Sequence, residues 1–298
     1  MRVHIGVTVF ISLMSFHLCG YAQTELILPL NPDFIPSAMN PASMAGNTTA
    51  SASIAFRNQI QFRNARRIYE GNLFSWEVPV DAHTSRLSYW GMNAFSSIET
   101  GIKRLKCNAL YAYSTPLNAS THLRLGIQMG FDHRRYGNSY LFPDDIYGSP
   151  QNAAYASKAS LSVALGGEII WKQWTAGIAI HQLGNQEEPI RSIISLHFND
   201  VAHWDVSETQ ILATLAYYHI DNQDQIRLST GMMWSQIGWR IAQTFGMQKS
   251  ESTSTFGLNY QFKHLHFQYD IGWSYYNSAL INSTGFRSEF GIIYLLSN

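Results

Sequence analysis

Among the acidic and histidine residues of this 298-residue chain, two arrangements stand out as able to do chemistry, and the adjacent Glu187 and Glu188 resemble the first. Asp144 and Asp145 are adjacent in "FPDDIYG" and could bind a cation or act as an acid–base pair. Adjacent aspartates in such a segment more often form a turn, because the carboxylate hydrogen-bonds to nearby backbone groups. His264 and His266 stand two residues apart and could chelate one ion. The simpler interpretation is that His264 is a turn residue and His266 is a strand residue that faces the lumen.

The rest of the sequence lacks the motifs of catalysis and of phosphate binding. The eleven histidines show no HxxxH or HExxH spacing, and there is no nucleophile elbow, P-loop or GxGxxG that follows a strand. The segment "LGGEI" (Leu165–Ile169) is interpreted as a strand with little side-chain bulk and not as a phosphate cradle. We therefore predict a protein that is not an enzyme, with no catalytic residue, no cofactor and no metal site.

The composition is unusual for a cytosolic protein. Charged residues make up 13% of the chain, against a usual share of about 25%. Aromatic residues also reach 13%, and the formal net charge is zero. No block of basic residues forms a nucleic-acid footprint, so we expect no nucleic-acid partner.

The N-terminus has the pattern of a secretory signal peptide. Arg2 supplies the basic region, Ile5–Cys19 forms an apolar core of suitable length, and the small residues that follow place cleavage after Ala22. A membrane anchor and lipoprotein processing at Cys19 are the alternatives. No later segment has the 18 or more consecutive apolar residues of a transmembrane helix. Cys107 then remains alone, so no internal disulfide can form.

Most of the chain after the signal alternates between apolar and polar residues. In "THLRLGIQMGFDH" (Thr121–His133), a period of two residues indicates an extended strand with one apolar and one polar face. We predict that the apolar face of this strand contacts lipid through Leu123, Leu125, Ile127, Met129 and Phe131.

Fourteen strand-like segments follow one another to the end of the chain. No amphipathic helix interrupts them, and no change of composition suggests a second domain. The predicted strands are Ser51–Gln61, Leu73–Pro79, Thr84–Asn93, Lys106–Thr115, His122–His133, Ala159–Trp171, Trp174–His181, Ile190–Phe198, Glu208–Tyr218, Gln225–Trp234, Ile237–Gln248, Thr253–Phe262, His264–Tyr275 and Arg287–Leu296.

The lengths of the links between these strands give a second signal. Links after even-numbered strands are brief, as in "KQ", "SQ" and "KH", with Asn199–Ser207 as the exception. Links after odd-numbered strands are generally longer, and the longest is Arg134–Lys158. Short and long links at opposite ends are typical of outer-membrane barrels, as are aromatic residues near strand ends. The aromatic residues expected at such ends are Trp171, Trp174, Tyr217, Tyr218, Trp234, Trp239, Tyr275 and Tyr276.

The sequence therefore predicts an all-β protein, a transmembrane antiparallel β-barrel of about 14 strands. A soluble periplasmic β-protein, with the apolar faces buried in a core, is the structural alternative. The predicted organisation is a signal peptide over 1–22, a periplasmic lead-in over 23–50 and the barrel over 51–298. The residues predicted to face the lumen are Arg124, Asp132, Arg227, Arg240, Asp270 and Glu289.

Two segments at the start of the mature chain resemble the N-terminal signature of the PorP/SprF family of type IX secretion proteins. They are "MNPASMAGN" (Met39–Asn47) and "IAFRNQ" (Ile54–Gln59), and "GFRSEFGIIYLL" is similar to the closing strand of that family. The residues that carry the signature are Asn40, Pro41, Ala42, Gly46, Arg57, Asn58 and Gln59.

The resemblance implies an outer-membrane component of the type IX secretion system that supports export or surface anchoring of cargo such as gliding adhesins. It also implies contact with outer-membrane lipid and with the translocon or periplasmic lipoproteins. An even strand number would put both barrel termini in the periplasm. The alternative is a porin-like or fatty-acid-transporter-like channel. The proline-rich lead-in either enters the lumen, docks a periplasmic partner or is a simple linker.

Overall fold

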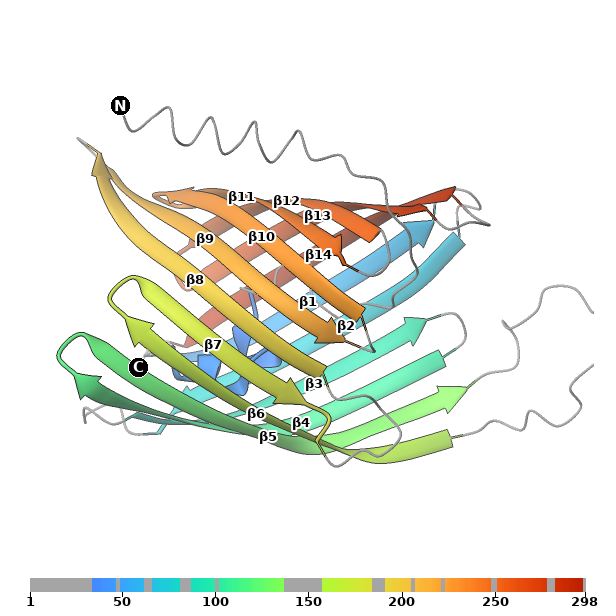
Figure 1. Ribbon diagram of the computed structural model, residues 1–298, viewed down its shortest axis with the longest axis horizontal. Coiled ribbons are helices and arrows are strands. Elements are labelled where there is room, and N and C mark those ends of the chain that lie inside the picture. Colours follow the sequence, from blue (N-terminus) through green and yellow to red (C-terminus); the bar gives the residue numbers. More distant parts are fainter. Residues whose placement is uncertain are drawn as a thin grey trace, which may run out of the picture.

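The polypeptide forms one antiparallel sheet that closes on itself as a barrel (Figure 1). A computed structural model describes residues 34–46, 49–61, 66–80, 87–99, 102–136, 157–183, 191–204, 207–220, 223–247, 251–277 and 282–296. Each strand pairs with its neighbours in the sequence, and β1 pairs with β14. The prediction of a 14-stranded antiparallel barrel is confirmed.

Most strands are longer than the sequence pattern predicted, mainly at the ends away from the tight turns, while β7 has the predicted bounds and β11 is shorter. Their bounds are β1 Ala50–Gln61, β2 Arg66–Pro79, β3 Leu87–Glu99, β4 Ile102–Asn118, β5 Thr121–Tyr136, β6 Ser157–Trp171, β7 Trp174–His181, β8 Arg191–Trp204, β9 Ser207–Ile220, β10 Gln223–Trp234, β11 Ile237–Gly246, β12 Glu251–Phe262, β13 Leu265–Asn277 and β14 Asn282–Leu296.

Side chains alternate between the two faces of the wall along the strands. On β5, Leu125, Ile127, Met129 and Phe131 have exposed fractions between 37% and 52%, whereas Gln128 is buried. An apolar face on the outside and a polar face on the inside is the arrangement that suits a barrel surrounded by lipid.

The link after β8 corrects one sequence expectation. Residues 199–204 were assigned to a long turn, but β8 continues to Trp204 and β9 begins at Ser207. The polar and aromatic residues of this segment pair across the two strands, from Asn199 with Leu212 to Trp204 with Ser207. The expected nine-residue turn is therefore wrong. The longer link on this side of the barrel is instead 80–86, between β2 and β3.

The links that follow β1, β3, β9 and β13 are also shorter than expected. Only residues 100–101 separate β3 from β4, and only residues 221–222 separate β9 from β10. The longest link, between Tyr136 and Ser157, lies at the same end of the barrel. Ala50 pairs with Leu296, so the start of β1 and the end of β14 lie together at the opposite end, with the turns at 119–120, 172–173, 235–236 and 263–264.

The aromatic residues divide between the two faces. Trp171, Trp174, Trp234 and Trp239 are exposed near strand ends, as expected of an interfacial girdle. Tyr218 is buried instead and packs with Met39 inside the barrel, which corrects its assignment to the girdle.

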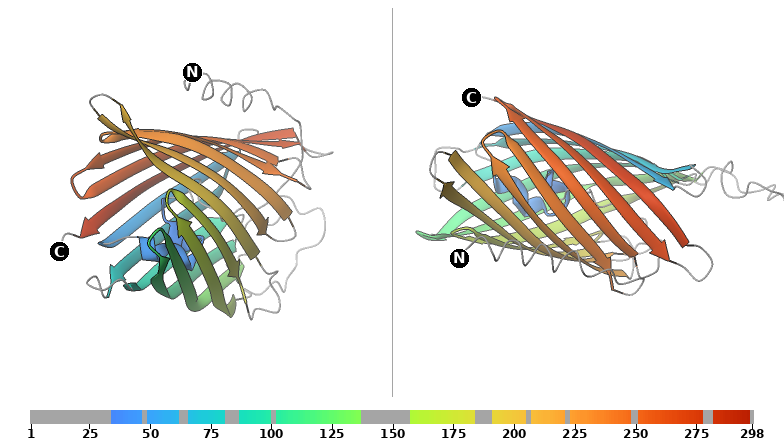
Figure 2. Two further views of the ribbon diagram at one scale, coloured as in Figure 1. Left: turned by 60° about the vertical axis from the view of Figure 1, so that its left-hand side comes forward. Right: turned by 90° about the horizontal axis from the view of Figure 1, so that it is seen from above.

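The segment Phe34–Gly46 lies inside the barrel as two short 3₁₀ helices, η1 (Pro36–Ala38) and η2 (Pro41–Gly46). Figure 2 shows this segment, in blue, enclosed by the strands in both views. We call it the plug. Among the described residues, no helix is long and apolar enough to cross a membrane.

A charged residue on the exposed face should be costly near the middle of a strand and tolerated near its end. Ile127→Arg, in the middle part of β5, is expected to destabilise the barrel in lipid by about 2–4 kcal/mol, because the guanidinium would face hydrocarbon. Leu117→Arg, near the turn-side end of β4, is the matched control and should cost about 0–1 kcal/mol. Denaturant unfolding in vesicles measures both values, and equal costs would contradict the lipid-facing assignment.

Candidate functional site: a plugged barrel interior

The plug sequence "FIPSAMNPASMAG" contains no charged residue, and its prolines shape it. Pro36 and Pro41 each start a 3₁₀ helix, where the fixed φ of proline suits a first helical position and its missing N–H is not needed. Between the helices, the Oδ1 atom of Asn40 accepts a hydrogen bond of 3.0 Å from the backbone N–H of Ala42. This bond sets the start of η2 and directs the amide nitrogen of Asn40 outward from the plug.

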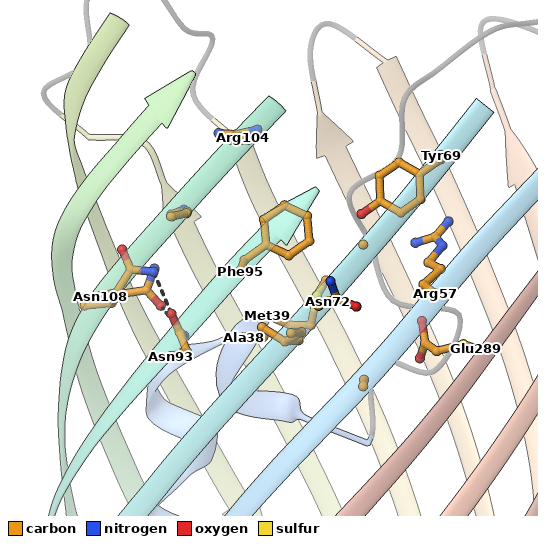
Figure 3. Close-up of a pocket in the computed structure, with 15 residues that line it drawn as sticks. Ala38, Met39, Arg57, Tyr69, Asn72, Asn93, Phe95, Arg104, Asn108 and Glu289 are labelled. Atoms are coloured by element: carbon orange, nitrogen blue, oxygen red, sulfur yellow. Dashed lines mark hydrogen bonds between the residues drawn. The ribbon is translucent and has the colours of Figure 1, made fainter. Parts of the chain in front are cut away.

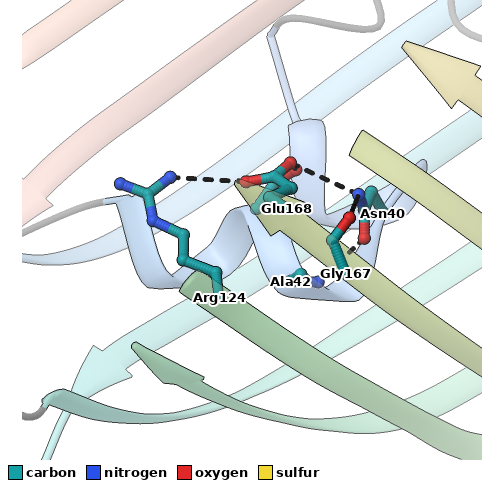
Figure 4. Close-up of polar contacts among 6 residues, drawn as sticks. Asn40, Ala42, Arg124, Gly167 and Glu168 are labelled. Atoms are coloured by element: carbon teal, nitrogen blue, oxygen red, sulfur yellow. Dashed lines mark hydrogen bonds and ion pairs between the residues drawn. The ribbon is translucent and has the colours of Figure 1, made fainter. Parts of the chain in front are cut away.

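Glu168 on β6 is the main polar anchor of the plug (Figure 4). Its carboxylate accepts hydrogen bonds from Asn40 Nδ2, at 3.3 Å, and from the hydroxyl of Ser43. Its other oxygen lies 3.4 Å from a guanidinium nitrogen of Arg124 on β5. Hydrogen bonds to charged groups each contribute about 1.5–3 kcal/mol, so this one buried carboxylate fixes a neutral segment strongly.

Two further polar contacts hold η1 and the residue after it. The Ser37 hydroxyl donates to the carboxylate of Glu77 on β2, and both side chains are buried. His181, at the end of β7, places Nε2 2.7 Å from the backbone carbonyl oxygen of Met39. The plug is therefore tied to β2, β6 and β7, which lie on different parts of the wall.

Glycines in the wall leave the space that the plug occupies. A Cβ atom at Gly126 would lie 2.3 Å from the Ala42 nitrogen, and one at Gly166 would lie 2.0 Å from the Asn40 Oδ1 atom. A Cβ at Gly91 would meet the sulfur of Met44, and one at Gly291 would meet the Phe34 ring. These contacts are closer than any side chain permits, so glycine is required where the plug backbone approaches β5.

Apolar packing fixes the plug at three places. Phe34 and Ile35 form a buried cluster with Ala55 on β1. Met39 packs against residues of β7–β9, and Met44 and Ala45 pack against β3 and β4. The plug thus contacts opposite sides of the barrel.

A cavity of about 110 Å³ lies between the plug and the end of the barrel that carries the longer links. Figure 3 shows Ala38 and Met39 of the plug on one side of it and Arg57, Tyr69 and Arg104 on the walls. The lining combines apolar, amide and charged groups, the last comprising Arg57, Arg104, Lys106 and Glu289.

The ion pairs of the interior compensate charge locally. Arg104 Nε donates to Asp132 Oδ1 at 2.8 Å, and Arg240 donates to Asp270 at the same distance. Arg57 lies over the Tyr69 ring, with its guanidinium carbon 5.3 Å from the ring centre, in a cation–π contact.

The structure places the six predicted lumen residues on the inner side of the wall, with different degrees of burial. Arg124 keeps 19% of its side chain exposed. The other five have exposed fractions of 0–5%, namely Asp132, Arg227, Arg240, Asp270 and Glu289. Of the predicted lipid-facing set, Leu123 is half-buried and the other four are exposed.

The signature residues divide between the plug and the first strand. Asn40, Pro41 and Ala42 are buried in the plug, and Gly46 ends η2. On β1, Arg57 and Gln59 are buried and Asn58 is half-buried on the alternate face. The predicted cleavage site at Ala22 lies outside the described residues.

Sequence reasoning missed the wall residues that hold the plug, chiefly Glu77, Glu168 and His181. Glu168 was visible as a single acid beside two glycines in "LGGEI", on a strand otherwise lacking charge after its first residues. The pattern indicated little side-chain bulk, but only the fold shows that this gap is filled by Asn40 and Pro41.

No group of three or more metal-ligating side chains occurs among the residues that the structure describes. His264 is exposed in the turn after β12, and His266 follows on β13. Asp144 and Asp145 lie outside the described residues.

Comparison with protein families gives one match. The profile described as type IX secretion system membrane protein PorP/SprF matches residues 34–294, a range that includes the plug and reaches into the last strand. The resemblance inferred from the motifs is confirmed. No curated protein matches the sequence.

Several solved structures share this fold at low sequence identity. The CymD monoaromatic hydrocarbon channel has a TM-score of 0.56 at 9% identity, and covers 89% of this chain and 93% of its own. The toluene transporter TodX of Pseudomonas putida has a TM-score of 0.54 at 10% identity, and the match covers 93% of this chain and 94% of TodX. A Pseudomonas aeruginosa FadL homologue has a TM-score of 0.52 at 10% identity, and the match covers 92% of this chain and 96% of the homologue. These similarities concern the fold, and with the family they support an outer-membrane protein.

A methyl group on the inner wall should loosen the plug. Gly126→Ala places Cβ against the plug backbone, and overpacking of this kind costs about 1–3 kcal/mol. We expect the amides of residues 34–46 to exchange hydrogen about tenfold faster or more, as measured by mass spectrometry. Gly167→Ala is the matched control, because its Cβ would meet nothing closer than 3.7 Å. Unchanged protection in Gly126→Ala would show that the plug does not sit against this glycine.

Proposed function

Because the chain belongs to the PorP/SprF family of type IX secretion system membrane proteins, we propose that it is a non-enzymatic outer-membrane component of that system. In this role it supports the export or the surface anchoring of secreted cargo such as adhesins. The family supports membership of the machine, and the cargo and its anchoring are our inference.

The observation that carries the proposal is the plug. Its buried residues contact strands on opposite sides of the barrel, and its polar groups are held by Glu77 and Glu168. A barrel filled in this way is suited to act as a membrane-embedded scaffold, because substrate need not pass through its interior. The family signature Asn40–Ala42 lies at the point where the plug is closest to the wall.

We assign the two ends of the barrel to different partners. The end with the longest link, residues 137–156, would meet cargo or the translocon outside the cell, as outer loops do in such barrels. The end with the tight turns, where Ala50 pairs with Leu296, would face the periplasm and its lipoproteins. Both barrel termini would then lie in the periplasm.

Co-purification tests this role. The tagged full-length chain, extracted from outer membranes with mild detergent, should recover other type IX secretion components, identified by mass spectrometry. An unrelated tagged barrel from the same membranes is the control. Recovery of the same proteins by both baits, or of no secretion component by the tagged chain, would contradict the proposal.

A channel for small molecules is the second candidate. It is favoured by the cavity of about 110 Å³ beside the plug and by the fold shared with CymD and TodX, which are a hydrocarbon channel and a toluene transporter. In this case the plug would have to move for a solute to pass.

Planar-bilayer recordings distinguish the two candidates. The plugged barrel should carry no steady ion current. Gly126→Ala, which loosens the plug, should give current, and Gly167→Ala should remain silent. Steady current through the unaltered chain would favour the channel.

A further inference from the structure

The cavity beside the plug carries charges of both signs on one part of its wall. Arg57 on β1 and Glu289 on β14 both line it, and they are direct partners in the register of these two strands. Directly opposite residues of an antiparallel pair have Cβ atoms about 4.5–5.5 Å apart. A guanidinium and a carboxylate therefore stand beside each other at the cavity, as Figure 3 shows at the right of the view.

The charged groups of the lining already interact within the chain. Arg104 donates to Asp132, and Arg57 lies over the Tyr69 ring. The remaining charged groups of the lining also interact with other residues. A buried charge is costly unless it is paired, so a ligand with a net charge would compete with these interactions. A ligand that carries both charges offers one to each sign and adds no net charge, which the lining therefore favours.

Closer to the plug, the lining is uncharged. The Phe95 ring on β3 and the side chain of Met39 supply apolar surface (Figure 3). Next to them, Asn93 is fixed from both sides, because Asn108 Nδ2 donates to its Oδ1 at 2.6 Å and its own Nδ2 donates to Gln128 Oε1 at 3.3 Å. The cavity thus has a part suited to an apolar group as well as a part suited to charges.

The volume of the cavity limits the size of a ligand. It measures about 110 Å³, whereas an apolar cavity of about 150 Å³ holds one benzene molecule. A ligand for this site is therefore compact and no larger than a single small ring.

We propose that the cavity binds a small α-amino acid in its zwitterionic form. The carboxylate of the ligand lies against Arg57, its ammonium group against Glu289, and its side chain against Phe95. One carbon separates the two charges of an α-amino acid, so they match a cation and an anion on directly opposite residues of two strands. The site is independent of the secretion role, because binding requires neither cargo nor a periplasmic partner.

Isothermal titration calorimetry on the detergent-solubilised full-length chain tests the site with three compounds of similar size at neutral pH. L-Alanine should bind. L-Alaninamide keeps the ammonium group without a carboxylate, and propionate keeps the carboxylate without an ammonium group. Each of these two should bind at least about tenfold more weakly, because one charge-assisted contact is lost.

Glu289→Gln should weaken the binding of L-alanine by about tenfold or more for the same reason. Glu70→Gln is the matched control, because Glu70 alternates with the buried Tyr69 and Gly71 and lies on the outer face of β2. It should bind L-alanine within about twofold of the unaltered chain.

Phe95→Ala changes the size of the ligand that is accepted and keeps the proposal testable if Glu289→Gln does not fold. L-Phenylalanine should bind Phe95→Ala at least about tenfold more tightly than the unaltered chain, because the ligand ring takes the place of the deleted one. Phe131→Ala, on the outer face of β5, is the control and should not gain this binding. Absence of L-alanine binding to the unaltered chain, equal binding of the three compounds, or failure of Phe95→Ala to gain L-phenylalanine would overturn the proposal.

Discussion

The barrel interior depends on one constraint, which is the close approach of the short neutral plug to two glycines of the wall. Gly126 and Gly166 allow the backbone of Pro41 and Ala42 to lie against β5 and β6. Once this contact is made, Glu168 is within reach of both Asn40 and Ser43. Steric fit and charge-assisted hydrogen bonding thus act at the same place.

The plug also explains how a barrel of this size can be filled. Eight strands enclose a space that their own side chains can fill, while 16–18 strands leave an aqueous channel. Fourteen strands fall between these limits. Here the chain supplies the missing volume from its own N-terminal segment, and the space left over is the cavity between Met39 and the charged walls.

The outer wall follows a simpler rule than the interior. Exposed apolar residues form its middle, and tryptophans and basic residues lie towards strand ends. The contrast between two in-register pairs on β4 and β5 illustrates the difference. The inner arginines Arg104 and Arg134 lie beside Asp132, whereas Lys103 and Arg135 are exposed on the outer face.

The sequence by itself determined the barrel, because a two-residue period is local and reports directly which face of a strand each side chain occupies. For this reason the strand number and the bounds of Trp174–His181 could be predicted. The same local pattern misplaced Asn199–Trp204, because a polar, charged strand end looks like a turn until its partner strand is known. The signature Asn40–Ala42 could be recognised from its residue types, but its place inside the barrel could not be predicted from them. Only the tertiary structure decided that this segment enters the barrel, because its contacts with Glu168, about 125 residues away, depend on the closure of the whole sheet.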